Sequence, residues 1–282
     1  MKKRKKKRKN FLYSVRKNSK IYFLTLSKGG KMKCGVQLYT LREYCKSVEA
    51  TTNTFRKIRD IGYKYVQISA VSEPKDVKEL KKILDDSGLI AVSTHTGYER
   101  IIKETEKVIE EHKILGCEAI FCPGLPPELH NKDGYLKVAD EFNKVIEKII
   151  ENGLILGYHN HGIEFERYDG KTGLEILLDN SPELEAEIDT YWVQYGGGDP
   201  SYWIEKYKGR VSQVHFKDMG IIKNQQVMPP IGDGNLNWER IIKVCKKAKV
   251  KYALIEMDNP TIDPFEALKK SLENLKNFGI KT

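Results

Sequence analysis

Four side chains of the types that bind divalent metals each stand at the polar end of a short apolar stretch. They are His159, Asp189, His215 and Glu256, which follow Leu154–Tyr158, Leu184–Ile188, Val211–Val214 and Tyr252–Ile255. The gaps of 30, 26 and 41 residues between them each match one strand–helix unit. Two imidazoles and two carboxylates can hold one divalent cation and leave positions open for a substrate. The pattern therefore predicts a metal enzyme, if the fold brings these four side chains together.

From Cys34 onward the chain alternates short β-rich stretches with longer amphipathic ones. The predicted strands are Cys34–Tyr39, Tyr63–Ile68, Leu89–Thr94, Ala119–Cys122, Leu154–His159, Leu184–Asp189, Val211–His215 and Tyr252–Glu256. The predicted helices are Thr54–Ile61, Val77–Leu84, Ile101–Leu115, Tyr135–Ile150, Trp238–Ala248 and Pro264–Asn277, where apolar residues recur at three- and four-residue spacing. Gly62, Gly88, Gly116 and Gly153 fit the left-handed residue that ends a helix, and Pro74 and Pro264 fit first-turn positions.

Eight strands that alternate with helices over about 250 residues predict an α/β fold, a single-domain (β/α)8 barrel spanning residues 32–282. Such a barrel gathers the carboxyl ends of its strands on one face, where the four metal-type side chains would meet. An open doubly wound sheet is the rival. It is disfavoured because no G-x-G-x-x-G follows the first strand, and the pair Gly29-Gly30 precedes it.

The positive charge of the chain is concentrated at its amino-terminal end. Residues 1–31 hold 13 of the 49 Lys and Arg and none of the 39 Asp and Glu, so residues 32–282 carry 36 basic and 39 acidic side chains. The basic run could be an arm for nucleic acid or anionic membrane, and it makes a poor signal peptide because Ile21–Leu26 is too short an apolar stretch. We favour a third interpretation, that Met32 is the natural start and that residues 1–31 form a disordered basic tail.

Composition bounds the class of protein further. Hydrophobic residues make up 40% of the chain, which is enough for a sizeable core, and no run approaches the ~18 apolar residues of a membrane span. The five cysteines form an odd set without a C-x-x-C pair, so we expect a reduced, cytoplasmic compartment.

Other polar residues at predicted strand ends are candidates for the same site. His161 shares a strand face with His159 by the two-residue period, and Lys217 is related to His215 in the same way. Lys217 could place positive charge near a substrate oxygen. Candidate substrate contacts are Tyr39, Gln67 and His95, together with Trp192 as an apolar wall for a sugar ring.

Six motifs give the chain a resemblance to a known family. They are residues 35–42 (GVQLYTLR), 157–161 (GYHNH), 188–192 (IDTYW), 214–218 (VHFKD), 231–234 (IGDG) and 255–258 (IEMD). In this order, over residues 32 to about 280, the chain resembles the xylose isomerase-like TIM-barrel superfamily, in its sugar phosphate isomerase/epimerase branch. The resemblance implies one divalent ion, Mn, Co or Zn with Mg as a further candidate, held by Asp189, His215 and Glu256. The fourth ligand would be His159, which stands where the family commonly has Glu, with His161 and Glu164 as reserves.

The resemblance also implies a type of reaction. The branch suggests a metal-dependent isomerase or epimerase that abstracts a proton next to a carbonyl of a sugar or keto-sugar, phosphorylated or not. The strand-eight base would be Glu256. Since His159 replaces the strand-five Glu, the second base would be His161 or Glu164, with Lys217 as an electrostatic partner. The Tyr-His-x-His pattern is also similar to inosose dehydratases and enzymes of 3-keto sugars, so a dehydratase or β-eliminating lyase is the alternative.

Two rival functions belong to other classes. An AP endonuclease shares this barrel, but it needs extra histidines, including one at the position of Trp192, and the whole chain has six His. The acidic balance of residues 32–282 also opposes binding to a phosphate backbone. A metal-binding barrel without catalysis is the other rival, and the complete ligand set argues against it. We therefore expect a small carbohydrate as partner, neither nucleic acid nor membrane, and we leave a homo-oligomer open.

Overall fold

The structure, a computed structural model, describes residues 13–17, 20–24 and 31–280. The chain divides into two compact units, Met1–Lys31 and Met32–Thr282. Within the first unit, β1 (Tyr13–Lys17) pairs antiparallel with β2 (Lys20–Leu24). The expectation of disorder for the rest of residues 1–30 falls outside the described residues.

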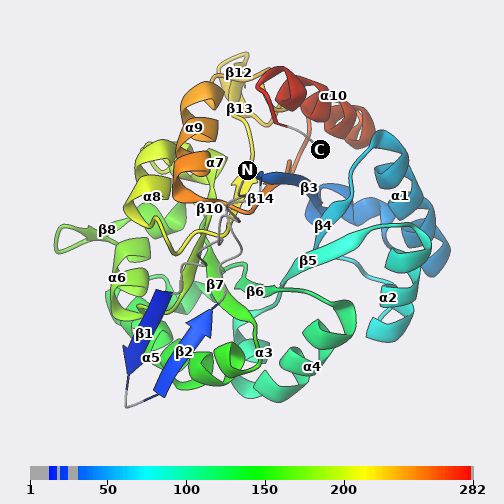
Figure 1. Ribbon diagram of the computed structural model, residues 1–282. Helices are drawn as coiled ribbons and strands as arrows, with labels where there is room; N and C mark the ends of the chain where they lie inside the picture. Colours follow the sequence, from blue (N-terminus) through cyan, green and yellow to red (C-terminus); the bar gives the residue numbers. More distant parts are fainter. Residues whose placement is uncertain (1–12, 18–19, 25–30, 281–282) are drawn as a thin grey trace, which may run out of the picture. The chain divides into compact units, whose positions relative to one another are not determined.

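The second unit is built on a closed barrel of eight parallel strands. In chain order they are β3 (Lys33–Gln37), β4 (Tyr65–Ile68), β5 (Ile90–His95), β6 (Ala119–Cys122), β7 (Ile155–His159), β10 (Glu185–Asp189), β11 (Gln213–Phe216) and β14 (Tyr252–Ile255). Each strand pairs with its neighbour in sequence, and β14 closes the barrel against β3. The helices form a ring around these strands (Figure 1). The predicted (β/α)8 barrel is confirmed, and each predicted strand overlaps one of the eight.

Helices occupy the connections between the barrel strands. They are α1 (Val48–Ile61), α2 (Val77–Asp86), α3 (Tyr98–Lys103), α4 (Thr105–Leu115), α5 (Lys132–Glu151), α6 (Gly173–Asn180), α7 (Thr190–Tyr195), α8 (Pro200–Lys206), α9 (Trp238–Ala248) and α10 (Pro264–Asn277). The six predicted helices are present, although the predicted 101–115 is two helices that meet at Glu104. The short helices α6, α7 and α8 were not predicted because each is too brief to show a clear helical period.

Local signals explain most of the helix ends. Gly62, Gly88, Gly116 and Gly153 all adopt positive φ after a helix, and Pro264 is the first residue of α10, as predicted. The prediction for Pro74 was wrong. The α2 helix begins later, at Val77, because the Asp76 side chain accepts hydrogen bonds from the backbone N–H groups of Lys78 and Glu79 and so caps the helix.

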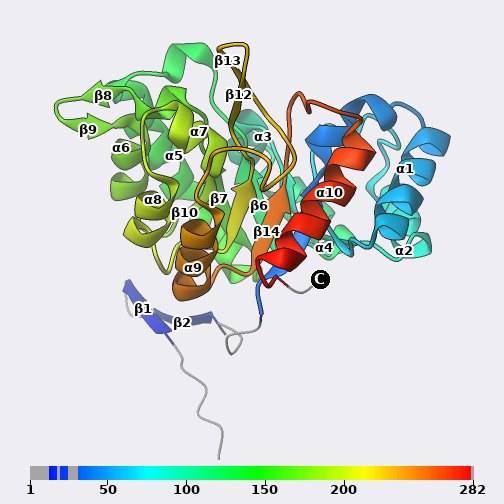
Figure 2. The ribbon, with the colours of Figure 1, turned by 90° about the horizontal axis from the view of Figure 1, so that it is seen from above.

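Short irregular segments lie in several of the loops. They are the 3-10 helices η1 (Leu38–Tyr44), η2 (Pro127–Leu129) and η3 (Ile163–Phe165), and the two hairpins β8–β9 (Arg167–Tyr168, Lys171–Thr172) and β12–β13 (Gly220–Ile222, Gln225–Val227). Figure 2 shows the β12–β13 hairpin rising from the edge at which the barrel strands end. Among the described residues, no helix combines the length and the apolar character that crossing a membrane requires.

The side chains inside the barrel change from apolar to charged along the strands. Val92, Tyr252 and Leu254 form an apolar cluster against which Tyr65 packs, and Tyr65 and Tyr252 are the first residues of β4 and β14. Higher up, the ring of Phe121 fills the space that a Cβ at Gly157 would need, since that Cβ would lie 2.2 Å from the ring. The interior below the carboxyl ends of the strands is therefore closely packed.

Candidate active site

The four predicted metal ligands meet at the carboxyl end of the barrel. His159 and Asp189 are the last residues of β7 and β10, His215 lies within β11, and Glu256 follows β14. One ligand atom from each lies within 4.8 Å of the others, and all four residues are buried. The four side chains meet because they lie on neighbouring strands and point into the barrel, and Asp189 and His215 are direct partners in the sheet.

Individual contacts within this set leave two buried atoms without a hydrogen-bond partner. His215 Nδ1 lies 2.9 Å from Glu256 Oε2 and 3.9 Å from Asp189 Oδ2. Asp189 Oδ1 accepts a hydrogen bond from the Trp192 N–H (2.9 Å) and caps α7, but Asp189 Oδ2 and His159 Nδ1 accept and donate none. Buried polar atoms are rarely left unpaired in folded proteins. A divalent cation among the four side chains would satisfy His159 Nδ1 and would join the Lys217 ammonium, 3.2 Å away, as a partner of Asp189 Oδ2. The residues therefore fit the metal that the family resemblance implies.

Lys217 supplies a buried positive charge next to the ligand set. It is 1% exposed, and its Nζ lies 2.9 Å from Glu256 Oε2, 3.2 Å from Asp189 Oδ2 and 2.9 Å from Asp258 Oδ1. Burial would lower the pKa of Lys217, but these three carboxylates raise it above its ordinary value. Lys217 is therefore held in its charged form next to the ligand set.

The carboxylates and imidazoles around Lys217 have shifted pKa values of their own. Burial raises the pKa of Asp189 to about 7, against the opposing effect of the Lys217 charge. Burial would lower the pKa of His215, but Glu187 and Glu256 raise it to about 10. Burial, with the Lys217 charge, lowers the pKa of His161 to about 4. At neutral pH His161 is therefore uncharged and able to accept a proton.

His161 lies beside the ligand set although it is no longer in a strand. The strand β7 ends at His159, yet the ring centroid of His161 is 4.8 Å from that of His159 and 5.4 Å from that of Trp192. The intervening Asn160 is buried, and its Oδ1 accepts a hydrogen bond from the Asp189 N–H (3.1 Å). It thereby ties the end of β7 to the end of β10.

Glu164, the other candidate base, has both carboxylate oxygens engaged. Oε1 accepts a hydrogen bond from the Tyr158 hydroxyl (2.6 Å), and Oε2 accepts one from the His161 N–H (2.7 Å). The side chain is fully buried, and burial raises its pKa. These contacts hold the loop that carries His161, so they favour a positioning role for Glu164 over a catalytic one.

The four candidate substrate contacts are divided between the rim and the interior. Tyr39 is 37% exposed, and the half-buried Trp192 lies against both His161 and Lys217. Gln67 is fully buried and bonded to Ser93, Glu187 and His215. His95 bonds to Gln37 and Glu187. The contacts of Gln67 and His95 are those of residues that orient other side chains.

One buried acid of the site, Glu187, escaped the sequence analysis. It lies on β10 two residues before Asp189, and it forms a second group of possible metal-binding atoms with His95, His159 and His215. Burial would raise the pKa of Glu187, but His215 and His95 hold it at about 2. The signal that could have revealed it is the two-residue period, because an acid within an apolar strand on the face of Asp189 must point into the barrel.

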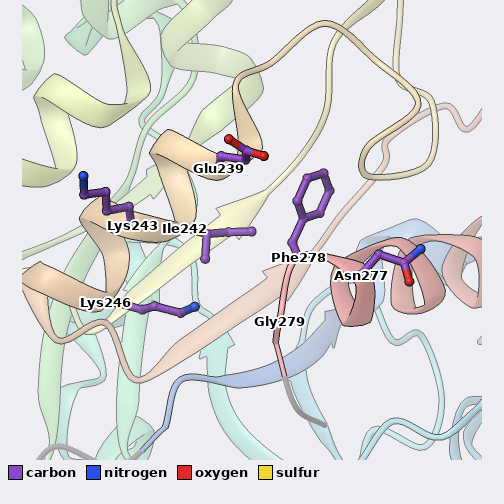
Figure 3. A pocket seen from close by; sticks show the side chains of 7 residues that line it. All are labelled: Glu239, Ile242, Lys243, Lys246, Asn277, Phe278 and Gly279. Carbon is purple, nitrogen blue, oxygen red and sulfur yellow. The ribbon is translucent and has the colours of Figure 1, made fainter.

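A surface pocket of about 500 Å³ lies away from these strand ends, between α9 and α10 (Figure 3). It is lined by Glu239, Ile242, Lys243, Lys246, Asn277, Phe278 and Gly279. None of these belongs to the ligand set, and the lining offers one carboxylate and neither histidine nor cysteine. We therefore place the chemistry at the strand ends.

Comparison with known proteins defines the family. The chain belongs to the xylose isomerase-like TIM barrel family, whose model matches residues 55–278. It is 27% identical over 261 residues to an inosose dehydratase of Clostridium beijerinckii, covering 77% of this chain and 83% of that protein. A second inosose dehydratase, from Clostridium perfringens, is 26% identical over 263 residues and is covered to 84% of its length, with 77% of this chain matched.

Solved structures give the same result for the fold. A sugar phosphate isomerase/epimerase from Parabacteroides distasonis is 25% identical with a TM-score of 0.73, and the match covers 91% of this chain and 98% of that one. The 3-keto-D-glucoside 4-epimerase of E. coli, 20% identical with a TM-score of 0.65, covers 88% of this chain and is itself covered completely (100%). The second likeness shows the fold alone. The predicted resemblance to this superfamily and branch is confirmed, and the chain is a member of an enzyme family.

Proposed function

We propose that this protein is a divalent-metal-dependent enzyme that removes a proton from the carbon next to a carbonyl of a sugar, keto-sugar or inosose. The observation that carries the proposal is the buried set His159, Asp189, His215 and Glu256, in which His159 Nδ1 has no hydrogen-bond partner, with the neutral His161 beside it. Mixed nitrogen and oxygen ligands suit Mn²⁺ or Co²⁺, and Zn²⁺ or Mg²⁺ are further candidates.

The residues of the site divide the chemical work. A bound divalent ion would act as a Lewis acid on the substrate carbonyl. His161 is the candidate to accept the proton of the adjacent carbon, because its ring is neutral and its centroid lies 4.8 Å from that of His159. The Lys217 ammonium lies where it stabilises negative charge on a substrate oxygen, and Trp192 covers it from one side at 5.5 Å. Burial of the ligand set keeps water from weakening these interactions.

Two outcomes can follow proton removal. Return of the proton to a different position or face gives isomerisation or epimerisation, which the likeness to the Parabacteroides distasonis structure supports. Loss of the β-hydroxyl gives dehydration, which is the activity named for the two clostridial relatives. The engagement of both Glu164 oxygens leaves Glu256 and His161 as the candidate bases for either outcome.

Incubation in D₂O with ketoses, 3-keto sugars and inososes, followed by NMR, tests the proposal. The protein is loaded with Mn²⁺ for the incubation. A sample loaded with Zn²⁺ or Mg²⁺ is used where paramagnetic broadening of the NMR lines must be avoided. Deuterium at the carbon next to the carbonyl, without loss of mass, indicates an isomerase or epimerase. Loss of water indicates a dehydratase. Absence of deuterium exchange with every compound of the panel contradicts the proposed chemistry. It would favour the rival hypothesis of a metal-binding barrel without catalysis.

A pair of variants then tests which candidate is the base. His161→Gln should slow deuterium exchange by about 10²- to 10⁴-fold, the usual contribution of a general base, while the metal content stays unchanged. Glu164→Gln should retain a substantially larger share of the rate, because glutamine can still contact the loop and Tyr158. Equal loss in both variants would assign the base role to Glu164 as well.

A further inference from the structure

A fifth acidic side chain, Glu187, lies at the centre of the imidazoles of the site. It is fully buried and is the direct partner of His159 in the sheet. Its Oε2 lies 2.8 Å from His95 Nε2 and 3.7 Å from His159 Nδ1, and its Oε1 lies 3.3 Å from His215 Nε2. An acid in this place could be a ligand of a second, lower ion or could orient the ligands of the upper one. The direction of its hydrogen bonds decides between these roles.

The first hydrogen-bond chain runs from Glu187 through Gln67 to His215. A carboxylate only accepts hydrogen bonds, so the contact of 2.6 Å identifies Gln67 Nε2 as the donor to Glu187 Oε1. Gln67 Nε2 also donates to Ser93 Oγ (3.0 Å). The amide oxygen of Gln67 must then face His215 Nε2, 2.7 Å away, and this nitrogen must carry a hydrogen. His215 Nδ1, which faces Glu256 and Asp189, is the nitrogen left for a metal.

The second chain reaches Glu187 through Gln37 and His95. The Tyr39 N–H donates to Gln37 Oε1 (2.5 Å), so the Gln37 amide nitrogen faces His95 Nδ1 at 3.2 Å and donates to it. The hydrogen of a neutral His95 must therefore be on Nε2, from which it is donated to Glu187 Oε2. Both nitrogens of His95 are used, so that ring has no lone pair left for a lower ion, and each oxygen of Glu187 already accepts a hydrogen bond.

We infer that Glu187 is a positioning residue: it accepts hydrogen bonds that set the tautomers of His95 and, through Gln67, of His215, and it thereby directs His215 Nδ1 toward a single ion in the upper set. This inference rests on the proposed function for the ion, but its hydrogen-bond geometry belongs to the protein alone. Side chains that orient metal ligands in this way typically contribute ten- to hundredfold to metal affinity.

Glu187→Gln and a matched control, Glu185→Gln, test the role of the carboxylate. Glu185 lies on the same strand and face, two residues earlier, and accepts a hydrogen bond from the Ser212 N–H with no imidazole contact among the described residues. Competition with a chelator should show a ten- to hundredfold larger dissociation constant for Co²⁺ in Glu187→Gln, with one ion still bound per chain. In the control, the dissociation constant should change by less than about twofold. The visible absorption spectrum of bound Co²⁺ should shift in Glu187→Gln alone.

Three outcomes overturn the inference. One is unchanged Co²⁺ affinity and spectrum in Glu187→Gln. Another is the binding of two ions by the wild-type chain and of one by Glu187→Gln, which would make Glu187 a ligand. The third comes from ¹⁵N NMR of the metal-free wild-type protein, which needs no variant to fold: a neutral His95 that carries its hydrogen on Nδ1 contradicts the second chain. If the wild-type chain binds no ion while His95 carries its hydrogen on Nε2, the proposed function fails and the positioning of His95 by Glu187 stands.

Discussion

The two ends of the barrel interior use the same eight strands for opposite purposes. Toward the strand starts, Tyr65 and Tyr252 belong to an apolar cluster with Val92 and Leu254, and the Lys33 ammonium lies over the rings of Tyr65 and Tyr252, at 4.7 and 5.3 Å. Toward the strand ends, the interior holds buried acids, imidazoles and a lysine. Burying an apolar side chain stabilises the fold, whereas burying a charge costs free energy unless it is paired.

This contrast indicates which end of the barrel interior stabilises the fold and which end costs free energy of folding. At the strand ends His159 Nδ1 remains without a hydrogen-bond partner, a cost that a protein bears where a ligand later satisfies the atom, while Asp189 Oδ2 is paired with the Lys217 ammonium at 3.2 Å. At the strand starts no such atoms occur in the apolar cluster. Substitutions at the two ends should therefore separate metal binding from stability.

The largest effect is expected at the metal set. Asp189→Ala should weaken metal binding by more than about 100-fold, above the range for residues that only orient ligands, and abolish turnover. Elemental analysis of the metal-loaded, desalted protein measures this directly. Asp199→Ala is the matched control, since Asp199 caps α8 as Asp189 caps α7 and lies outside the ligand set. The control should lose about 0.5–2 kcal/mol of stability and keep its metal. Full metal content in Asp189→Ala would rule out this ligand.

In the apolar cluster, Leu254→Ala should reduce stability while leaving all four metal ligands in place, although Leu254 is the direct sheet partner of His215. Leu254 is fully buried, so its removal leaves a cavity and should cost about 2–5 kcal/mol of unfolding free energy. Urea unfolding in the presence of a chelator gives the value, and titration with Co²⁺ should show a far smaller loss of affinity than in Asp189→Ala. Leu136→Ala, at a site that is 38% exposed on α5, should change the unfolding free energy by much less. A large loss of metal affinity in Leu254→Ala would show that the two ends are coupled.

A smaller effect separates a structural histidine from those of the site. His112, on α4 outside the barrel, lies 2.8 Å from Thr94 Oγ1 and 2.7 Å from the Val108 carbonyl oxygen, and burial lowers its pKa. Below about pH 6.5 His112 is protonated in the unfolded chain but stays neutral in the folded one. The free energy of unfolding therefore falls as the pH drops through this range. Above it, this contribution to pH dependence vanishes.

His112→Gln provides the measurement. At pH 8 the variant should be less stable than the wild type by about 1–3 kcal/mol, because it loses buried hydrogen bonds. As the pH falls from 6.5 toward 5, the difference between the two should narrow, since only the wild type carries the penalty at this position. Urea unfolding in chelator across this range gives both curves. A difference that stays constant or widens in acid contradicts the assignment of His112 as a buried neutral residue.

Much of the site could be predicted because strand ends and inward faces are local properties. The ligands His159, Asp189, His215 and Glu256 follow apolar stretches, and this position alone placed them on one face of a barrel. Glu164 shows the limit of such an argument. Its place three residues after His161 suggested a base, but only the fold reveals that the Tyr158 hydroxyl and the His161 N–H occupy both of its oxygens.

The amino-acid sequence by itself determined the barrel, the order of its strands and the face on which the metal-type side chains gather. Alternating apolar periods, helix caps and glycines act over a few residues, so they can be recognised without knowing the rest of the fold. The division of labour between Asp189 and Glu187 was decided only by tertiary structure. Both are acids on one face of β10, and they differ because Gln67 and His95, 120 and 92 residues away from Glu187 in the chain, donate their hydrogens to Glu187 and leave Asp189 Oδ2 without a hydrogen bond.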